Sequence, residues 1–94
     1  MQKLKSKYSF QDAGISGTRW SKSDELIVDF ELDNGSIPTA SIVFRGVKNR
    51  SALKAAIANS TLSDTSNICE IAIENKNTYI VGPYSIVCDS IYVP

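Results

Sequence analysis

The densest cluster of charge in the chain consists of carboxylates that could act as an acid–base pair or hold a divalent cation. Its members are Asp24, Glu25, Asp29, Glu31 and Asp33. Side chains alternate along a strand, so Asp29, Glu31 and Asp33 would share one face of it. Metal sites usually draw ligands from several elements, and a solvated strand face explains the row equally well. We expect no metal site here, and we expect side chains on neighbouring strands to compensate the repulsion within the row.

The second cluster is basic and leads into the start of an expected helix, a combination that can bind phosphate or a partner's carboxylates. It comprises Arg45, Lys48, Arg50 and Lys54, and it could extend towards Lys3, Lys5 and Lys7. The sequence carries no signature of a nucleic-acid-binding module, and no aromatic residue is interleaved within 45–54. A salt-bridging edge opposite the acidic strand is the simpler interpretation. Binding of nucleic acid or phosphate through 45–54 remains the alternative function.

Catalytic patterns are missing from the sequence. It contains no histidine, which removes Ser-His and Cys-His pairs and the commonest general base at neutral pH. The glycine-rich segment 14–17 lacks the lysine of a phosphate-binding loop. Cys69 and Cys88 each fall in an expected strand and are interpreted as buried thiols, although a disulfide is open if their Cα atoms approach within about 7 Å. We predict a protein that is not an enzyme and uses no cofactor.

Size and composition indicate one small globular domain spanning 1–94. The chain has 94 residues, 43% of them hydrophobic, and its ten basic and ten acidic residues cancel. Zero net charge argues against a dominant phosphate-binding or membrane-surface role, and it favours self-association. The stretch 1–10 is too polar for a signal-peptide core, and no run is long enough to span a membrane. We therefore expect a cytoplasmic protein, in its own cell or in the cytoplasm of an invaded host.

The elements that would position these residues begin with a hairpin. Apolar side chains alternate over 25–33, a turn signal follows at 33–36, and β-branched residues dominate 39–45. The preceding stretch, 11–24, has little apolar periodicity, and we interpret it as a loop anchored by Trp20. The Ala-rich run 50–59 places Leu53 and Ile57 on one helical face, with Asn49 or Ser51 as the cap. A helix this short is marginal alone, so it must pack on the sheet.

The last third of the chain is expected to form strands over 68–74, 78–81 and 84–93, with Gly82-Pro83 as a bulge or corner. The predicted fold is α+β: a single small domain with an antiparallel β-sheet of about five or six strands and one short helix packed on one face. A small β-barrel capped by the helix is the alternative.

The final segment, 84–93, has apolar residues on both faces, with Ile86 and Tyr92 on one and Val87 and Ile91 on the other. This pattern predicts a central strand, or a strand with one face covered by a partner. A single helix covers only one face of a sheet, so we expect this strand to offer an exposed edge or face to a protein partner or a second copy.

Tyr84 and Trp20 are further interface candidates, since aromatic rings with one polar end favour interfaces. The predicted function is non-enzymatic protein–protein contact, as an inhibitor, adaptor or assembly component. Small neutral domains of this type are common among accessory proteins of phages and mobile elements. The charged segments would help to set the orientation of the partners.

Overall fold

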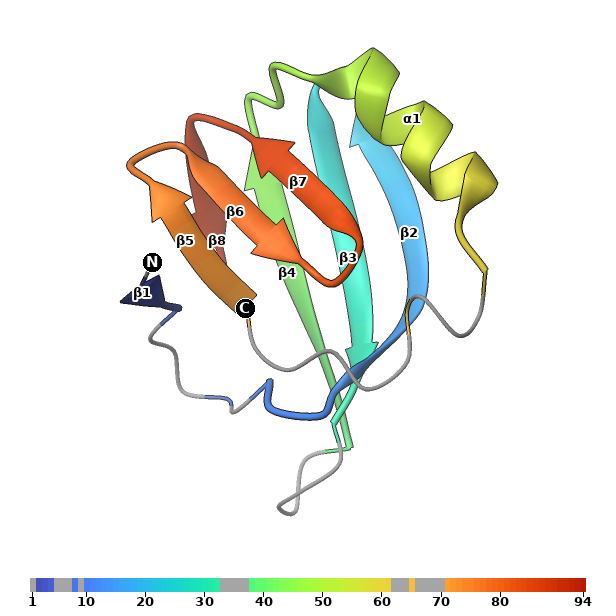
Figure 1. Ribbon diagram of the computed structural model, residues 1–94, viewed down its shortest axis with the longest axis vertical. Coiled ribbons are helices and arrows are strands. Elements are labelled where there is room, and N and C mark those ends of the chain that lie inside the picture. Colours follow the sequence, from blue (N-terminus) through green and yellow to red (C-terminus); the bar gives the residue numbers. More distant parts are fainter. Residues whose placement is uncertain (1, 5–7, 9, 33–37, 62–64, 66–70) are drawn as a thin grey trace.

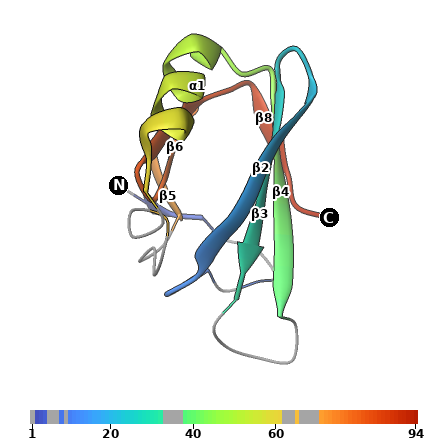
Figure 2. The ribbon, with the colours of Figure 1, turned by 90° about the vertical axis from the view of Figure 1, so that its right-hand side faces the viewer.

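In the described part of the chain, two antiparallel sheets face each other across one apolar core, and the short helix that follows the larger sheet's third strand lies beside the smaller sheet (Figures 1 and 2). The computed structural model describes residues 2–4, 8, 10–32, 38–61, 65 and 71–94. One sheet has the strand order β1-β5-β6-β7 and the other β2-β3-β4-β8. The α+β prediction is confirmed, with the strands divided between two sheets instead of gathered in one. The two sheets do not close into a barrel, so that alternative is wrong.

The sheet β2-β3-β4-β8 is built around the predicted hairpin. β3 (Glu25–Glu31) pairs antiparallel with β4 (Thr39–Arg45), and every second side chain of β3 is fully buried: Leu26, Val28 and Phe30. Alternation in the sequence therefore predicted this pair correctly, because one face of the sheet packs on the core and the other does not. The turn signal at 33–36 lies outside the described residues.

The interpretation of 11–24 as a loop is wrong. Residues Gly14–Lys22 form β2, which pairs with β3 and is the edge strand of the sheet. The register shifts between Ile15 and Gly17, and again between Trp20 and Lys22. Each bulge adds a residue and resets the alternation of side chains, which hides a strand from a period-two analysis of its sequence.

The C-terminal segment is also not the single central strand that we predicted. It divides into β7 (Tyr84–Val87) and β8 (Ser90–Tyr92), which are edge strands of different sheets. In β7 the even-numbered residues point towards the core, whereas after the crossover at Cys88 and Asp89 the odd-numbered residues do. Ile86 and Ile91 therefore both pack on the core. Ile86 and Ile91, which the sequence of 84–93 places on two faces of one strand, thus belong to two strands, and in each strand the isoleucine faces the core.

The crossover is fastened to the end of β4. The amide of Asp89 donates to the carbonyl of Arg45 (2.9 Å), and the amide of Lys48 donates to the carbonyl of Val87 (2.7 Å). Gly46 has a φ of +70°, and a Cβ at this position would lie against the carboxylate of Asp89. A side chain at position 46 would collide with this carboxylate, so the crossover at Cys88 and Asp89 requires glycine at position 46.

The predicted helix is confirmed as α1 (Arg50–Asn59), with Leu53 buried. It lies in the same layer as the smaller sheet, next to β7, and covers the part of the larger sheet that the smaller one leaves bare (Figure 2). Its C-terminal end is tied to β7 because Ser60 Oγ donates to the Ile57 carbonyl and shares a 2.7 Å hydrogen bond with the Tyr84 hydroxyl.

The remaining elements complete the smaller sheet. β5 (Ile71–Asn75) pairs with β6 (Thr78–Val81) and with the short β1 (Gln2–Lys3), and β6 turns into β7 at Gly82-Pro83. The part of the predicted 68–74 strand that precedes Ile71 lies outside the described residues. Within the described part of the chain, no helix has the length and apolarity needed to cross a membrane.

Candidate protein-binding face

The side of the sheet β2-β3-β4-β8 that points away from the core carries a row of apolar side chains. The register places Ile27 of β3 beside Val43 of β4, and Val43 beside Tyr92 of β8. Ile27 and Val43 are partly exposed, and Tyr92 retains 50% of its surface. Among the described residues, Tyr92 is the single exposed large hydrophobic side chain. We call this side of the sheet the outer face; among the elements that the structure describes, no helix or strand lies over it (Figure 2).

An acid–base pair borders the apolar row on one side. Glu25 lies directly across from Arg45 in the register, with Arg45 Nε 3.6 Å from Glu25 Oε2. The guanidinium of Arg45 also lies over the Tyr92 ring, 5.1 Å from its centroid. Ser21 Oγ donates to the other oxygen of Glu25 at 2.6 Å. Arg45 is therefore positioned by a carboxylate and an aromatic ring, while 53% of its side chain stays open to solvent.

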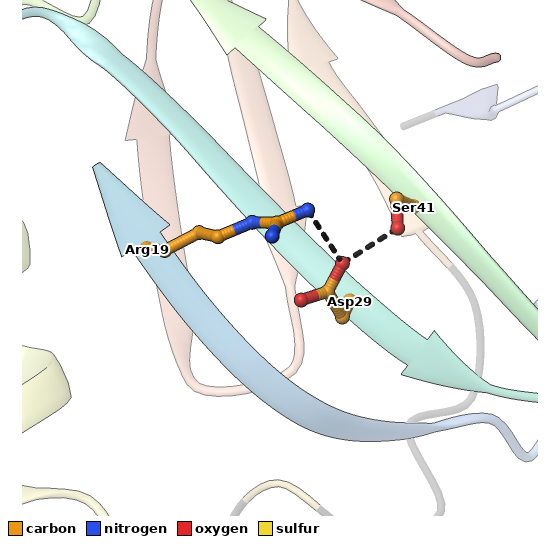
Figure 3. A network of polar contacts seen from close by, with 3 residues as sticks. All are labelled: Arg19, Asp29 and Ser41. Carbon is orange, nitrogen blue, oxygen red and sulfur yellow. Dashed lines mark hydrogen bonds and ion pairs between the residues drawn. The ribbon is translucent and has the colours of Figure 1, made fainter. Parts of the chain in front are cut away.

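A second polar group borders the row on the other side, where Asp29 connects three strands (Figure 3). Asp29 Oδ1 accepts a 2.6 Å hydrogen bond from Ser41 Oγ of β4 and lies 3.7 Å from the guanidinium of Arg19 on β2. Two carboxylates of β3 are thus compensated by neighbouring strands: Asp29 by Arg19 and Ser41, and Glu25 by Arg45. Arg19 was missed because its strand was interpreted as a loop.

The sheet edges, in contrast, are largely closed. The side chain of Asn49 donates to the carbonyl of Ser85 (2.7 Å) and accepts from the amide of Val87 (3.0 Å), and the Val87 carbonyl is occupied by Lys48. Asn49 precedes α1 but makes no side-chain cap to the helix. The Asn49 side chain thus occupies the backbone carbonyl of Ser85 and the backbone amide of Val87, which a neighbouring strand would otherwise bond. The edge at β2 differs, because two bulges interrupt it.

The predicted partner-binding residues of the C-terminal segment therefore separate into different environments. Tyr84 and Ile86 lie in the core, 3% and 0% exposed, and offer no surface to a partner; their inclusion was wrong. Ile91 is partly buried against the core, opposite Phe44. Val87 is partly exposed on the outside of the smaller sheet. Tyr92 is the one residue of the set that reaches the outer face.

The predicted basic set does not converge either. Arg45 belongs to the outer face, and Lys48 Nζ lies 3.3 Å from Asp89. Arg50 and Lys54 lie over the ring of Trp20, 5.4 and 5.9 Å from its centroid. Trp20 packs against the core from β2, beneath α1, and so supplies an aromatic neighbour that the segment 45–54 lacks in sequence. Lys5 and Lys7 lie outside the described residues.

The remaining reactive groups of the described residues are shielded or poorly placed for chemistry. Burial, and secondarily the charge of Asp89, raises the pKa of the Cys88 thiol to about 11, so this free thiol is protonated at neutral pH. Burial likewise raises the pKa of the Tyr79 hydroxyl. Across the described ranges, no three potential ligands gather to hold a metal ion. Cys69 lies outside those ranges.

One serine–lysine pair has the Ser-x-x-Lys spacing found in some hydrolases, Ser51 and Lys54 at the start of α1. A working pair needs the lysine desolvated and within hydrogen-bonding reach of the serine. Both side chains are exposed, and the ammonium of Lys54 is directed at the Trp20 ring. The arrangement is that of a solvated helix surface.

No protein-family model, curated protein or solved structure matches this chain.

Proposed function

We propose that this chain is a non-enzymatic protein-binding domain that acts by contact through its outer face, as an inhibitor, an adaptor or an assembly component. The observation that carries the proposal is the partly exposed apolar row Ile27, Val43 and Tyr92, which no helix or strand of the described residues covers. Association would bury this row, and the aromatic and arginine side chains at its end are the types that contribute most at protein interfaces.

The closed edges favour the face over strand addition. A partner strand added to β7 would have to displace Asn49 and Lys48 from the backbone groups of β7. β1 and β8 have two and three residues, too short to hold an added strand firmly. Few backbone groups at the described edges are thus free to pair with an added strand, whereas the outer face keeps an apolar centre between two polar groups.

The polar groups beside the row fit this role as well. Glu25 with Arg45, and Asp29 with Arg19 and Ser41, are partly exposed and already held in place within the free molecule. Groups held in their binding geometry lose little conformational entropy on association, and their charges select and orient the partner. We propose that the protein acts in the cytoplasm of the cell itself or of an invaded host, because the Cys88 thiol is free.

A paired substitution tests the proposal. Val43 and Val87 are both partly exposed valines that point away from the core, but from different sheets. We expect Val43→Asp to abolish binding of the physiological partner, measured by affinity capture from the native host and by titration, and Val87→Asp to leave it intact. Circular dichroism confirms that both variants fold. Binding that survives Val43→Asp, or that is lost equally in both variants, would overturn the assignment to this face.

Binding of nucleic acid or phosphate remains a second candidate because Trp20 brings an aromatic ring to Arg50 and Lys54. Rings and cations together form the usual surface for single strands. Phosphate contacts impose a steep loss of affinity with increasing salt. A salt series with a single-stranded oligonucleotide tests this candidate: affinity that falls with salt and with Trp20→Ala supports it, and the lack of measurable binding at low salt excludes it.

A further inference from the structure

The outer face is complementary to itself, and we propose that the partner it binds is a second copy of this chain. This inference rests on the proposed function and names the partner of the same face. Its basis is the positions that the strand register gives to the charged, apolar and aromatic side chains of the outer face. These positions determine which residues meet when two such faces are laid together about a two-fold axis.

The axis that fits runs parallel to the strands, midway between β3 and β4. Rotation about it lays β3 of one copy over β4 of the other and β2 over β8, because the sheet order is β2-β3-β4-β8. Each contact then occurs twice, as a two-fold interface requires. The sheets would pack in the aligned manner, which keeps the strands nearest the axis in closest register.

The contacts nearest the axis are matched in character. Ile27 meets Val43 of the second copy, so the apolar rows cover each other. Glu25 meets Arg45 of the second copy, and two pairs of this kind make a ring of four alternating charges around the axis. Asp29 meets Ser41 of the second copy, which places a hydroxyl donor opposite a carboxylate acceptor.

The outer strands of the face are matched too. Arg19 of β2 and Tyr92 of β8 lie in the same row as Ile27 and Val43. The rotation brings Arg19 of one copy over Tyr92 of the other, and a guanidinium over an aromatic ring is a favourable contact. Arg19 and Tyr92 are also the most exposed members of their row, at 65% of the side chain and 50% of the residue, so both can reach across the interface.

A two-fold axis across the strands gives a poor match. Through the apolar row, such an axis would place Glu25 of one copy against Asp29 of the other, two like charges. If the same axis passed midway between the apolar row and Asp29, it would place Ile27 of one copy against the Asp29 carboxylate of the other. The charge pattern therefore selects one orientation among the face-to-face arrangements.

The size of the face sets the expected strength. Four strands about 4.8 Å apart and seven residues of about 3.3 Å each outline roughly 440 Å², well below the roughly 800 Å² that each partner contributes to a standard interface. We expect a reversible dimer that forms at micromolar to millimolar concentrations. Sedimentation velocity across a concentration series is the suitable measurement.

A charge-exchange experiment tests the specific axis. Glu25→Arg alone brings Arg against Arg45 twice in a homodimer, and Arg45→Glu alone brings Glu against Glu25 twice. Mixed in equal amounts, the two variants form a dimer in which both contacts are again opposite in charge. We expect each variant alone to dimerise at least about tenfold more weakly than the wild-type chain, and the mixture to regain wild-type dimerisation.

A second set of variants tests whether the single variants dimerise weakly only because they fail to fold. The double variant Glu25→Arg, Arg45→Glu keeps the charge pair within each chain, and we expect it to dimerise with itself but not with the wild-type chain. Glu74→Arg and Lys76→Glu make the same charge changes at exposed positions on β5 and its following turn and serve as controls. We expect them to dimerise like the wild-type chain.

Three results would overturn the inference: a wild-type chain that stays monomeric up to about 1 mM, single variants that dimerise as well as the wild-type chain, or a mixture no better than its components. These outcomes are separable from failure of the proposed function. A monomeric chain that still captures another protein in a Val43-dependent manner loses the second copy as its partner but keeps the binding face.

Discussion

The substitution Gly46→Ala is a stringent test of how the two sheets are joined. Gly46 lies between β4 and α1 with a φ of +70°, and a Cβ built at this position lies against the carboxylate of Asp89. Asp89 is held there because its amide bonds to the Arg45 carbonyl at the sheet-to-sheet crossover. The new methyl group must therefore displace either the carboxylate or the crossover itself.

The expected cost combines three terms. The left-handed backbone conformation lowers the free energy of unfolding by about 1–2 kcal/mol for any residue that has a Cβ. Displacement of the Asp89 side chain lowers it by about 1 kcal/mol more through lost packing. The lower entropy of alanine in the unfolded chain offsets about 0.4–1 kcal/mol. The net destabilisation is about 1–2.5 kcal/mol, which corresponds to a melting temperature lower by about 4–20 °C for a domain of this size.

Thermal unfolding followed by circular dichroism measures this change. Gly82→Ala is the matched control, because Gly82 also has a positive φ, of 57°, but lies in an exposed turn. The background Asp89→Ala removes the obstructing carboxylate, so Gly46→Ala should cost less in that background than in the wild-type chain. An unchanged melting temperature for Gly46→Ala, or an equal cost with and without Asp89, would refute this account of the crossover.

Two further predictions concern the core. Leu53→Ala should destabilise the fold by about 2–5 kcal/mol in chemical denaturation, because Leu53 is the buried side chain by which α1 packs on the core, whereas the exposed Ala55→Ser should cost little. The Cys88 thiol should react with a thiol reagent only after denaturation. Because its pKa is higher in the folded state (about 11, against 9.0), its contribution to stability is complete below pH 9 and is lost as the pH rises towards 11. Cys88→Ala should reduce this loss of stability at alkaline pH, and an unchanged pH dependence of stability in this variant would contradict the raised pKa of Cys88.

The elements that the sequence predicted well are those specified by local signals. α1 follows from an Ala-rich run with Leu53 and Ile57 four residues apart, and β3 follows from uninterrupted alternation. β2 was missed because its bulges at Ile15–Gly17 and Trp20–Lys22 break the period on which the prediction depends. A bulge is specified by pairing with a distant strand, and no window of the sequence contains that information.

The candidate site was only partly predictable for the same reason. Compensation of the acidic strand by its neighbours was expected, and Arg45 was named as a candidate, but its pairing with Glu25 and Tyr92 depends on the order of strands. The pattern of 84–93 predicts Tyr84 and Ile86 at an interface, but both are buried, because the chain passes from one sheet to the other at Cys88 and no local signal marks that passage. Ile27 and Val43 alternate out of the core in sequence, yet their shared row with Tyr92 appears only once β4 is paired on both sides.

The contrast between closed edges and an open face bears on how far association can proceed. An exposed strand edge accepts another edge and leaves a new one free, so edge pairing can propagate into fibres. Asn49 and Lys48 cover the backbone of β7, and the bulges of β2 distort the other long edge. Face-to-face pairing about a two-fold axis consumes the outer face of both copies and stops at two. The chain has no net charge to keep its copies apart, so the proposed two-fold dimer would bury the outer face in a contact that ends at two copies.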